Sequence, residues 1–507
     1  MSGSTSGHSF ARNSALNLVG MLLPLVLAVV AFPPLVRGLG AARFGILSLA
    51  WAAIGYFGLF EFGLSRALTQ AVAQRLGNRR DEELSRIVGT ALVLLLVLGI
   101  VGAVAVVLAT PMLITRILNV PPELTDEAIT AFYVLAASLP FVVTTAGLRG
   151  LMEAHQHFGV ATALRLPLVA FMLVGPLLVL PFTHSLVAAV LMLAIGRVIS
   201  WVAHVVVCVR RYAYVRAEVP RLHSDEVAPL LRFGGWMTLT NVVSPMMHSL
   251  DRFLIGALLP MAAVAHYVTP YELVTKLTVI ATAILTATFP GFAATFSEDR
   301  ASMTHLYDRA LRTVVLLTFP VVFVAIALAH EGMRVWMGAA WPSESAVVLQ
   351  WLALGVFINS IAQAPYAALQ GAARPDLIAK LHLLELPLYV AVILMFARSF
   401  GLTGVAMAWT LRVTLDAVAL LVVAHRTLGL PMMPRLGSAW ILALMLAALG
   451  VAAMPMGTVP RIAYVVVVSG TFVAYAWLRL LTVAERNALI RWNRAPGVVV
   501  ETTEGIA

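Results

Sequence analysis

The sequence predicts an all-α protein that crosses a membrane many times, and three observations support this fold class. Of the 507 residues, 61% are hydrophobic and only 11% are charged, whereas a soluble globular protein carries about 25% charged residues. The mean hydropathy is +0.93. Long uncharged stretches recur, such as residues 88–108, and about 20 apolar residues are enough for a helix to span a bilayer core.

We expect about fourteen transmembrane helices joined by short loops. Their expected limits are 14–36, 44–68, 87–110, 128–151, 161–181, 185–209, 234–259, 263–293, 309–330, 345–370, 377–397, 402–424, 437–457 and 460–481. No loop between them is long enough to hold a separate folded domain. A large catalytic domain outside the membrane is therefore excluded, and we do not expect an enzyme.

Basic residues gather in the loops that follow even-numbered spans. With both chain ends included, about 24 of the 34 Lys and Arg residues lie on that side of the membrane. The loops after odd-numbered spans hold only Arg37, Arg43, Arg116, Arg334, Arg398 and Arg461. Because Lys and Arg are enriched in cytoplasmic loops, we expect both termini in the cytoplasm. The same rule accounts for the net charge of +10 without nucleic-acid binding.

An internal repeat with an offset of about 220 residues divides most of the chain into two halves. The motif "LRG" at 148–150 matches "LQG" at 369–371, and Pro24 matches Pro245. A six-span unit repeated in tandem implies two parallel repeats, related by an axis along the membrane normal. The expected domains are 1–220 (spans 1–6), 221–430 (spans 7–12) and 431–507 (spans 13 and 14 with a cytoplasmic tail).

Ionisable residues inside the spans are the candidate functional residues, because charges in a membrane are costly and usually face a cavity or one another. They are Glu61 in span 2, Arg197 in span 6, Asp251 and Arg252 in span 7, Glu272 and Lys276 in span 8, Glu385 in span 11, and Arg412 and Asp416 in span 12. Glu272–Lys276 and Arg412–Asp416 are each four residues apart, so each pair could neutralise itself. Arg197 has no acid within four residues, which favours a cavity role.

Span 7 contains the sequence "SLDRFLIG", in which an acid and a base are adjacent. At 100° per residue, Asp251 and Arg252 diverge too far to form a good ion pair on one helix, and His248 lies between them. Two interpretations stay open. The polar stripe is either a structural network between helices, or a cavity face on which Arg252 meets an anion. On that face Asp251 holds Arg252 or His248, or serves as a proton or cation site.

No motif indicates a metal site, a cofactor or a nucleotide. The chain has no P-loop, and its histidines do not follow a ligand spacing. His155 and His157 lie two residues apart in an expected cytoplasmic loop, which indicates a solvated turn. We therefore expect no metal and no cofactor.

Several motifs together resemble a known family of transporters. They are "LGAARFGILSLA" (39–50), "FGLFEFGLSRALTQAVAQ" (57–74), "LDRFLIGALLP" (250–260) and "VAHYVTPYEL" (264–273). Nearly the whole chain is similar to the Wzx-type polysaccharide-transporter branch of the multidrug/oligosaccharidyl-lipid/polysaccharide (MOP) exporter superfamily. The resemblance implies a MATE-like fold with two six-helix lobes around a central cavity, plus two extra helices.

The resemblance also implies a function. Family members move undecaprenyl-pyrophosphate-linked oligosaccharides across the inner membrane by alternating access, for surface polysaccharide synthesis, and polysaccharide polymerase machinery is an expected partner. Arg and Lys suit an anionic pyrophosphate. The expected substrate-binding residues are Arg197, Arg252, Lys276 and Arg412. The expected ion-coupling or structural residues are Glu61, Asp251, Glu272, Asp416 and His248.

Three alternatives remain. A lipid II flippase of the same superfamily would share the spans and the cationic cavity. A cation-coupled multidrug exporter would typically have twelve spans and an acid in its first lobe, but span 1 has no acid between Arg12 and Arg37. A membrane polymerase or ligase of lipid-linked glycans would usually carry a larger periplasmic loop than the longest one expected here, Thr110 to Glu127.

Overall fold

The structure is a computed structural model that describes almost all of the chain between residues 23 and 487. The described residues are 23, 25–78, 81–217, 221–295, 300–372, 374–432, 439–481 and 486–487, without the side chains of 81, 217, 233–248, 287, 289–290, 293–295, 300 and 439. Helices dominate this part of the chain, and no strand occurs in it. The all-α prediction is confirmed.

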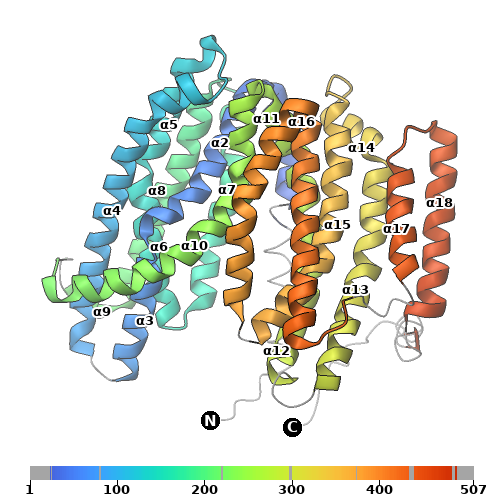
Figure 1. The fold of residues 1–507 in the computed structure, drawn as a ribbon. Helices are drawn as coiled ribbons and strands as arrows, with labels where there is room; N and C mark the ends of the chain where they lie inside the picture. Colours follow the sequence, from blue (N-terminus) through green and yellow to red (C-terminus); the bar gives the residue numbers. More distant parts are fainter. Residues whose placement is uncertain are drawn as a thin grey trace, which may run out of the picture. The chain divides into compact units, whose positions relative to one another are not determined.

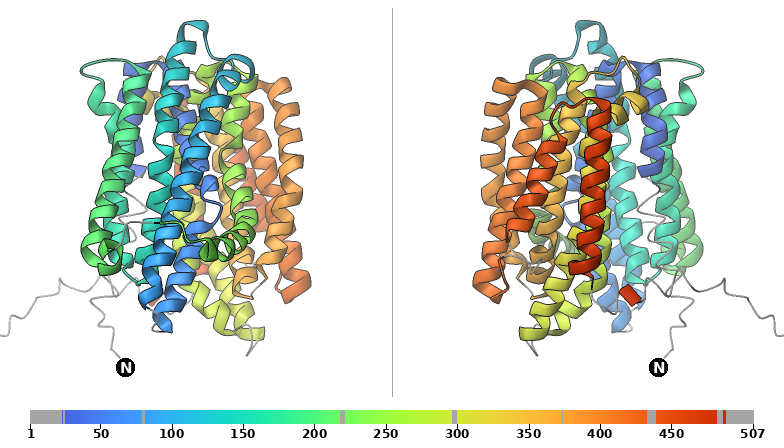
Figure 2. Two further views of the ribbon diagram at one scale, coloured as in Figure 1. Left: turned by 90° about the vertical axis from the view of Figure 1, so that its left-hand side faces the viewer. Right: turned by 90° about the vertical axis from the view of Figure 1, so that its right-hand side faces the viewer.

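Two compact units make up the fold. Unit 1 comprises Met1–Val279, Ala329–Gly355 and Pro375–Asp416, and unit 2 comprises Ile280–Leu328, Val356–Arg374 and Ala417–Ala507. Most helices within each unit run roughly parallel to one another, whereas α10 crosses unit 1 obliquely (Figures 1 and 2). The main helices are α2 (Ala41–Tyr56), α3 (Leu64–Gly77), α4 (Leu84–Met112), α5 (Thr125–Ala137), α6 (Leu139–Ala154), α7 (Phe158–Val179), α8 (Leu186–Arg211), α10 (Ser224–Leu258), α11 (Met261–Thr275), α12 (Thr278–Thr295), α13 (Arg300–Ala327), α14 (Ala329–Met337), α15 (Glu344–Gly371), α16 (Pro375–Leu428), α17 (Ala439–Ala452) and α18 (Thr458–Tyr475).

The helices are long and apolar enough for a membrane protein. Ten candidate spans occur among the described residues, with shorter apolar helices at Leu25–Leu39 and Trp440–Ala452. One candidate span, α16, is 54 residues long and turns at Gly401, where the backbone leaves the helical region. It therefore holds both predicted spans 11 and 12. The exact number of fourteen spans stays a prediction.

Several expected spans are interrupted rather than continuous; 128–151, for example, divides at Ser138, between α5 and α6. The expected span 44–68 breaks at Phe62 and Gly63, which both have positive φ, 45° and 66°. Phe62 follows the short 3₁₀ turn after α2. Gly63 directly precedes α3, and glycine adopts this left-handed conformation without a steric penalty. The expected span 263–293 breaks between α11 and α12, at Lys276.

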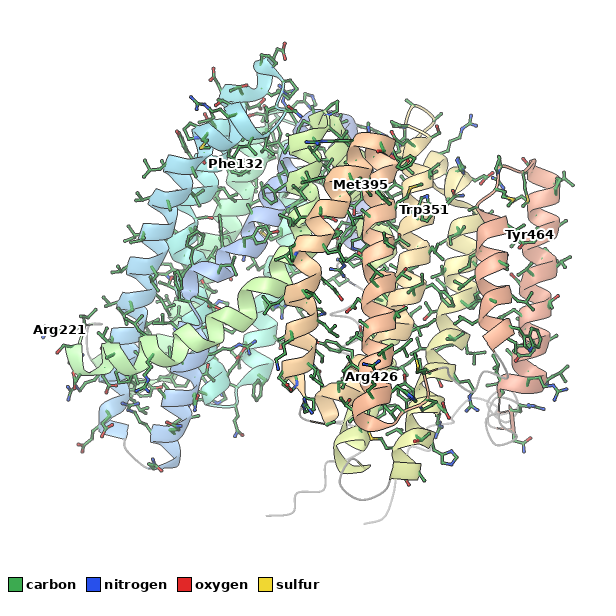
Figure 3. The ribbon with its side chains drawn as sticks, viewed as in Figure 1. Phe132, Arg221, Trp351, Met395, Arg426 and Tyr464 are labelled. Atoms are coloured by element: carbon green, nitrogen blue, oxygen red, sulfur yellow. The ribbon has the colours of Figure 1, made fainter. Side chains whose placement is uncertain are left out.

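Helix α10 begins ten residues before the expected start of span 7. Its first turn contains Asp225 and Glu226, and acidic side chains stabilise a helix N-terminus. Glu226 also accepts two hydrogen bonds from the Arg75 guanidinium, at 2.8 and 2.9 Å. Figure 3 shows Arg221 just before this start, at the opposite end of unit 1 from Phe132. The polar start of α10 is therefore fixed against the end of α3.

Helices from the two predicted lobes contact each other at one end of unit 1. This end carries the loops that follow the expected spans 87–110, 234–259 and 309–330. The Asn119 backbone N–H donates to the Gly256 carbonyl at 2.7 Å, and the Asn119 side chain donates to the Ala257 carbonyl at 2.9 Å. The Trp336 indole N–H donates to the Val29 carbonyl at 2.6 Å. In the same unit α2 packs along α11. These contacts hold the first and second halves of the chain together at this end.

Unit 2 is held by aromatic side chains on α13. Its Phe319 ring lies 4.7 Å from the ring of Phe472 and 5.9 Å from that of Phe357. Phe323 lies 5.8 Å from the ring of Tyr464, which is labelled on α18 in Figure 3. Helices α17 and α18 both pack against α13, as the right-hand view of Figure 2 shows. The last two helices of the chain are therefore part of a packed unit.

The turn inside α16 yields a first prediction. Gly401 has φ 59° and ψ −138°, and a Cβ added there would meet nothing closer than Glu344 Oε1, at 3.8 Å. Gly401→Ala should therefore act through backbone strain alone and cost about 1–3 kcal/mol. Thermal unfolding of the purified protein should show a lower midpoint.

Gly450→Ala is the matched control, because Gly450 lies inside α17 and an added Cβ there meets no atom within 4 Å. Alanine is the better helix former, so this variant should unfold no earlier than the wild type. Equal midpoints for both variants would show that the turn does not require glycine.

Candidate functional site

The centre of the candidate site is one carboxylate that is shared by two cations. Glu272 on α11 binds Arg252 of α10 through Oε1, with a distance of 2.5 Å to Nη2. Its other oxygen, Oε2, lies 3.0 Å from Lys276 Nζ. The Arg252 side chain is 8% exposed, whereas that of Lys276 is 37% exposed. The pair Glu272–Lys276 that the spacing suggested is present, but it is part of a triad.

Asp251 is buried beside this triad and has its own hydrogen-bond donors. Its Oδ1 accepts the backbone N–H of Arg252 at 2.8 Å, and its Oδ2 accepts the hydroxyl of Tyr267 at 2.8 Å. The side chain of Arg252 turns to Glu272 instead. The two adjacent charges of "SLDRFLIG" therefore contact different partners, as their angular separation on the helix predicts.

Tyrosine and tryptophan rings surround the triad. The Arg252 guanidinium carbon lies 5.1 Å from the centre of the Tyr271 ring, in the range of a cation–π contact. Tyr271 stacks on Tyr267 at 5.6 Å and meets the edge of Trp409 at 6.0 Å. These rings are not among the site residues predicted from the sequence. Their signal is the four-residue spacing of Tyr267 and Tyr271, which puts both on one helix face next to Glu272.

A second group of ionisable residues lies on the two arms of α16. Asp416 Oδ1 is 3.7 Å from His382 Nε2. No ion pair joins Asp416 to Arg412 in the described part of the chain, although their spacing suggested one. The Arg412 guanidinium instead stands over the Tyr389 ring at 5.4 Å. Arg412, Tyr389 and Glu385 line one small cavity.

Three carboxylate oxygens in this second group are buried without a donor. Both oxygens of Glu385 and Oδ1 of Asp416 have no hydrogen-bond partner among the described residues. The two residues are only 8% and 6% exposed. Burying a carboxylate without a partner is costly, so these carboxylates need a cation or a proton to neutralise them.

Arg197 and Glu61 lie outside both groups. Arg197 is on α8, and its Nε is buried without a hydrogen-bond partner among the residues that the structure describes. Glu61 ends the short 3₁₀ turn after α2, and its Oε2 is likewise buried without one. The side chain of His248 lies outside the described residues. The structure therefore assembles the charged residues of α10, α11 and α16 and leaves Arg197 and Glu61 apart.

The histidine turn after α6 differs from the expected solvated turn. His155 Nε2 lies 2.7 Å from the Tyr214 hydroxyl, and His157 Nδ1 lies 2.9 Å from the Tyr212 hydroxyl. The His155 ring also stacks on Tyr212 at 4.3 Å. Both histidines are therefore held by tyrosines that follow α8. These contacts could not be predicted from the sequence, because the partners lie far apart along the chain.

Comparisons with known proteins agree with this architecture. The model of the family described as polysaccharide biosynthesis protein matches residues 10–296. The "Putative O-antigen transporter" of Shigella flexneri is 28% identical over 417 residues, which cover 81% of this chain and 97% of that protein.

Two solved structures share the fold. A multidrug resistance MATE family transporter of the MOP superfamily, in an inward-facing conformation, has a TM-score of 0.70 at 17% identity, with 82% of this chain and 98% of that chain covered. The lipid II flippase MurJ, in an inward closed conformation, has a TM-score of 0.68 at 15% identity, with 90% and 98% covered. The predicted MATE-like fold is confirmed.

The shared carboxylate yields a second prediction. Glu272→Gln removes the carboxylate that pairs with the buried Arg252 guanidinium, and breaking a buried ion pair typically costs about 3–5 kcal/mol. We expect a large fall in the unfolding midpoint and in the amount of protein in the membrane. Replacing both partners, with Arg252→Leu and Glu272→Leu, should recover part of this loss.

The control is Lys276→Met, which removes the more exposed cation of the same triad. An exposed ion pair contributes about 0–1 kcal/mol, so this variant should unfold close to the wild type. If Glu272→Gln were as mild as Lys276→Met, the triad would not hold α10 and α11 together.

Proposed function

Because the chain belongs to the polysaccharide biosynthesis protein family, we propose that it is a flippase that carries lipid-linked oligosaccharides across the membrane for surface polysaccharide synthesis. The observation that carries this proposal is the similarity to the "Putative O-antigen transporter" over 97% of that protein's length. The helices that could span a membrane fit this role. The chemistry is transport, in which no covalent bond of the cargo changes.

The proposed cargo is an oligosaccharide linked to a polyprenyl pyrophosphate, most simply undecaprenyl pyrophosphate. Pyrophosphate is anionic, and guanidinium and ammonium groups bind it through charge-assisted hydrogen bonds. Lys276 is half-exposed and uses one of its donors on Glu272, so it has donors left for a phosphate. We assign Lys276, Arg412 and Arg197 to cargo binding, while the hydrocarbon tail stays in the surrounding lipid.

Arg252 has a different part in this proposal. It is 7% exposed and committed to Glu272, so it positions Glu272 and Lys276 toward the cargo. Asp251, Glu272, Asp416 and Glu61 are then structural or ion-coupling residues, together with His248. In this proposal the polar residues of span 7 contribute indirectly, because Arg252 holds Glu272 and Lys276 in place at the cavity.

Transport in this proposal proceeds by alternating access between two lobes, 1–220 and 221–430, with 431–507 outside the repeat. The basic loops orient the chain in the inner membrane with both termini in the cytoplasm. The contacts of Asn119 and Trp336 then lie at the periplasmic end, which supports a state closed to the periplasm. A polysaccharide polymerase is the proposed partner that receives the flipped repeat unit.

A deletion strain tests this function. Without the protein, the cell should lose its surface polysaccharide and accumulate the lipid-linked repeat unit in the cytoplasmic leaflet, and the intact gene should reverse both effects. Accumulation of lipid II would instead identify a lipid II flippase. Drug hypersensitivity with normal polysaccharide would identify a multidrug exporter, and accumulation of flipped but unpolymerised repeat units would identify a polymerase.

Variants of Arg197 in the same strain test the role of this residue. Arg197→Ala should reduce surface polysaccharide strongly at equal protein level, because it removes a buried cation that has no acidic partner among the described residues. Arg197→Lys should retain part of the transport, because it keeps the charge but not the planar fork of guanidinium donors. Normal polysaccharide with Arg197→Ala would remove Arg197 from the cargo site.

A further inference from the structure

The two arms of α16 bring three metal-ligating side chains to one place. His382 and Glu385 are three residues apart and share a helix face. Glu385 lies 16 residues before Gly401 and Asp416 lies 15 residues after it, so the turn at Gly401 sets them opposite each other. One ligand atom from each of the three residues lies within 4.8 Å of the other two.

The distances suit a small cation held between these atoms. Two ligands bound to a zinc ion at about 2.1 Å, in tetrahedral geometry, are about 3.4 Å apart. His382 Nε2 and Asp416 Oδ1 are 3.7 Å apart. Small rotations of side chains would therefore complete a first shell of three protein ligands, with water in the remaining position.

The buried oxygens independently point to a missing positive partner. Glu385 is 8% exposed, its oxygens have no donor among the described side chains, and the group that it faces is a second acid, Asp416. The nearby Arg412 does not supply one, because its guanidinium lies over the ring of Tyr389. A cation bound between Glu385 and Asp416 would give these oxygens a partner without any change in the helices.

The ligand set selects the class of cation. Carboxylates alone would suit Mg²⁺ or Ca²⁺, but imidazole favours Zn²⁺ and similar transition metals. We propose that His382, Glu385 and Asp416 form a binding site for a divalent transition-metal ion, with Zn²⁺ as the expected occupant. The site clamps the two arms of α16 together. It goes beyond the proposed transport and does not depend on it.

Metal binding by the purified, untagged full chain tests the proposal. Metal-free protein in detergent should take up one equivalent of Zn²⁺ in a calorimetric titration and retain it on elemental analysis. Glu385→Gln, which has nearly the same shape, and His382→Gln should each weaken binding by at least tenfold. Glu61→Gln is the matched control and should bind Zn²⁺ like the wild type.

X-ray absorption of the zinc-loaded protein gives a second readout. The first shell should contain only nitrogen and oxygen at about 2.0–2.2 Å. A sulfur ligand would place the metal at Cys208, the only cysteine in the chain, and overturn the assignment. The assignment also fails if the wild type takes up no stoichiometric Zn²⁺. Glu385 and Asp416 would then share a proton instead of a metal ion. Equal binding by Glu385→Gln, His382→Gln and the wild type would place the metal elsewhere.

Discussion

The candidate site depends on the two ion pairs that the half-buried carboxylate of Glu272 makes. An isolated charge at this depth would be expensive, yet Arg252 and Lys276 each occupy one oxygen of this carboxylate. One anion thereby stabilises two cations and fixes α10 to α11. Arg252 is committed to the protein, while Lys276 stays accessible enough to meet an anionic cargo.

Composition and charge distribution were sufficient to predict the fold class. Helices that cross the lipid must be apolar, so a high hydropathy identifies them directly in the sequence. The cost of burying charge also marked Asp251, Arg252, Glu272 and Lys276 as a site, and the structure brings these four together. The spacing of Glu272 and Lys276 predicted their contact correctly. The same spacing rule failed for Arg412 and Asp416, although both lie on one continuous arm of α16.

Partners on different helices could not be predicted from local spacing. Arg252 meets Glu272 because α10 and α11 pack together, and Asp416 faces His382 because the chain reverses at Gly401. The pairing of Asp416 with Arg412 that the spacing suggested is replaced by this contact across the turn. Breaks such as the one at Gly63 depend on backbone angles that an apolar pattern does not reveal.

Alternating access requires the proposed periplasmic end to open and close, and a reversible cross-link at that end tests this requirement. Asn119→Cys and Ala257→Cys, in a Cys208→Ala background, place a cysteine pair where Asn119 hydrogen-bonds to Ala257. Translocation of a labelled polyprenyl-pyrophosphate oligosaccharide is then measured in proteoliposomes. Oxidation should stop translocation, and reduction should restore it. Unchanged translocation by fully cross-linked protein would contradict alternating access through this end.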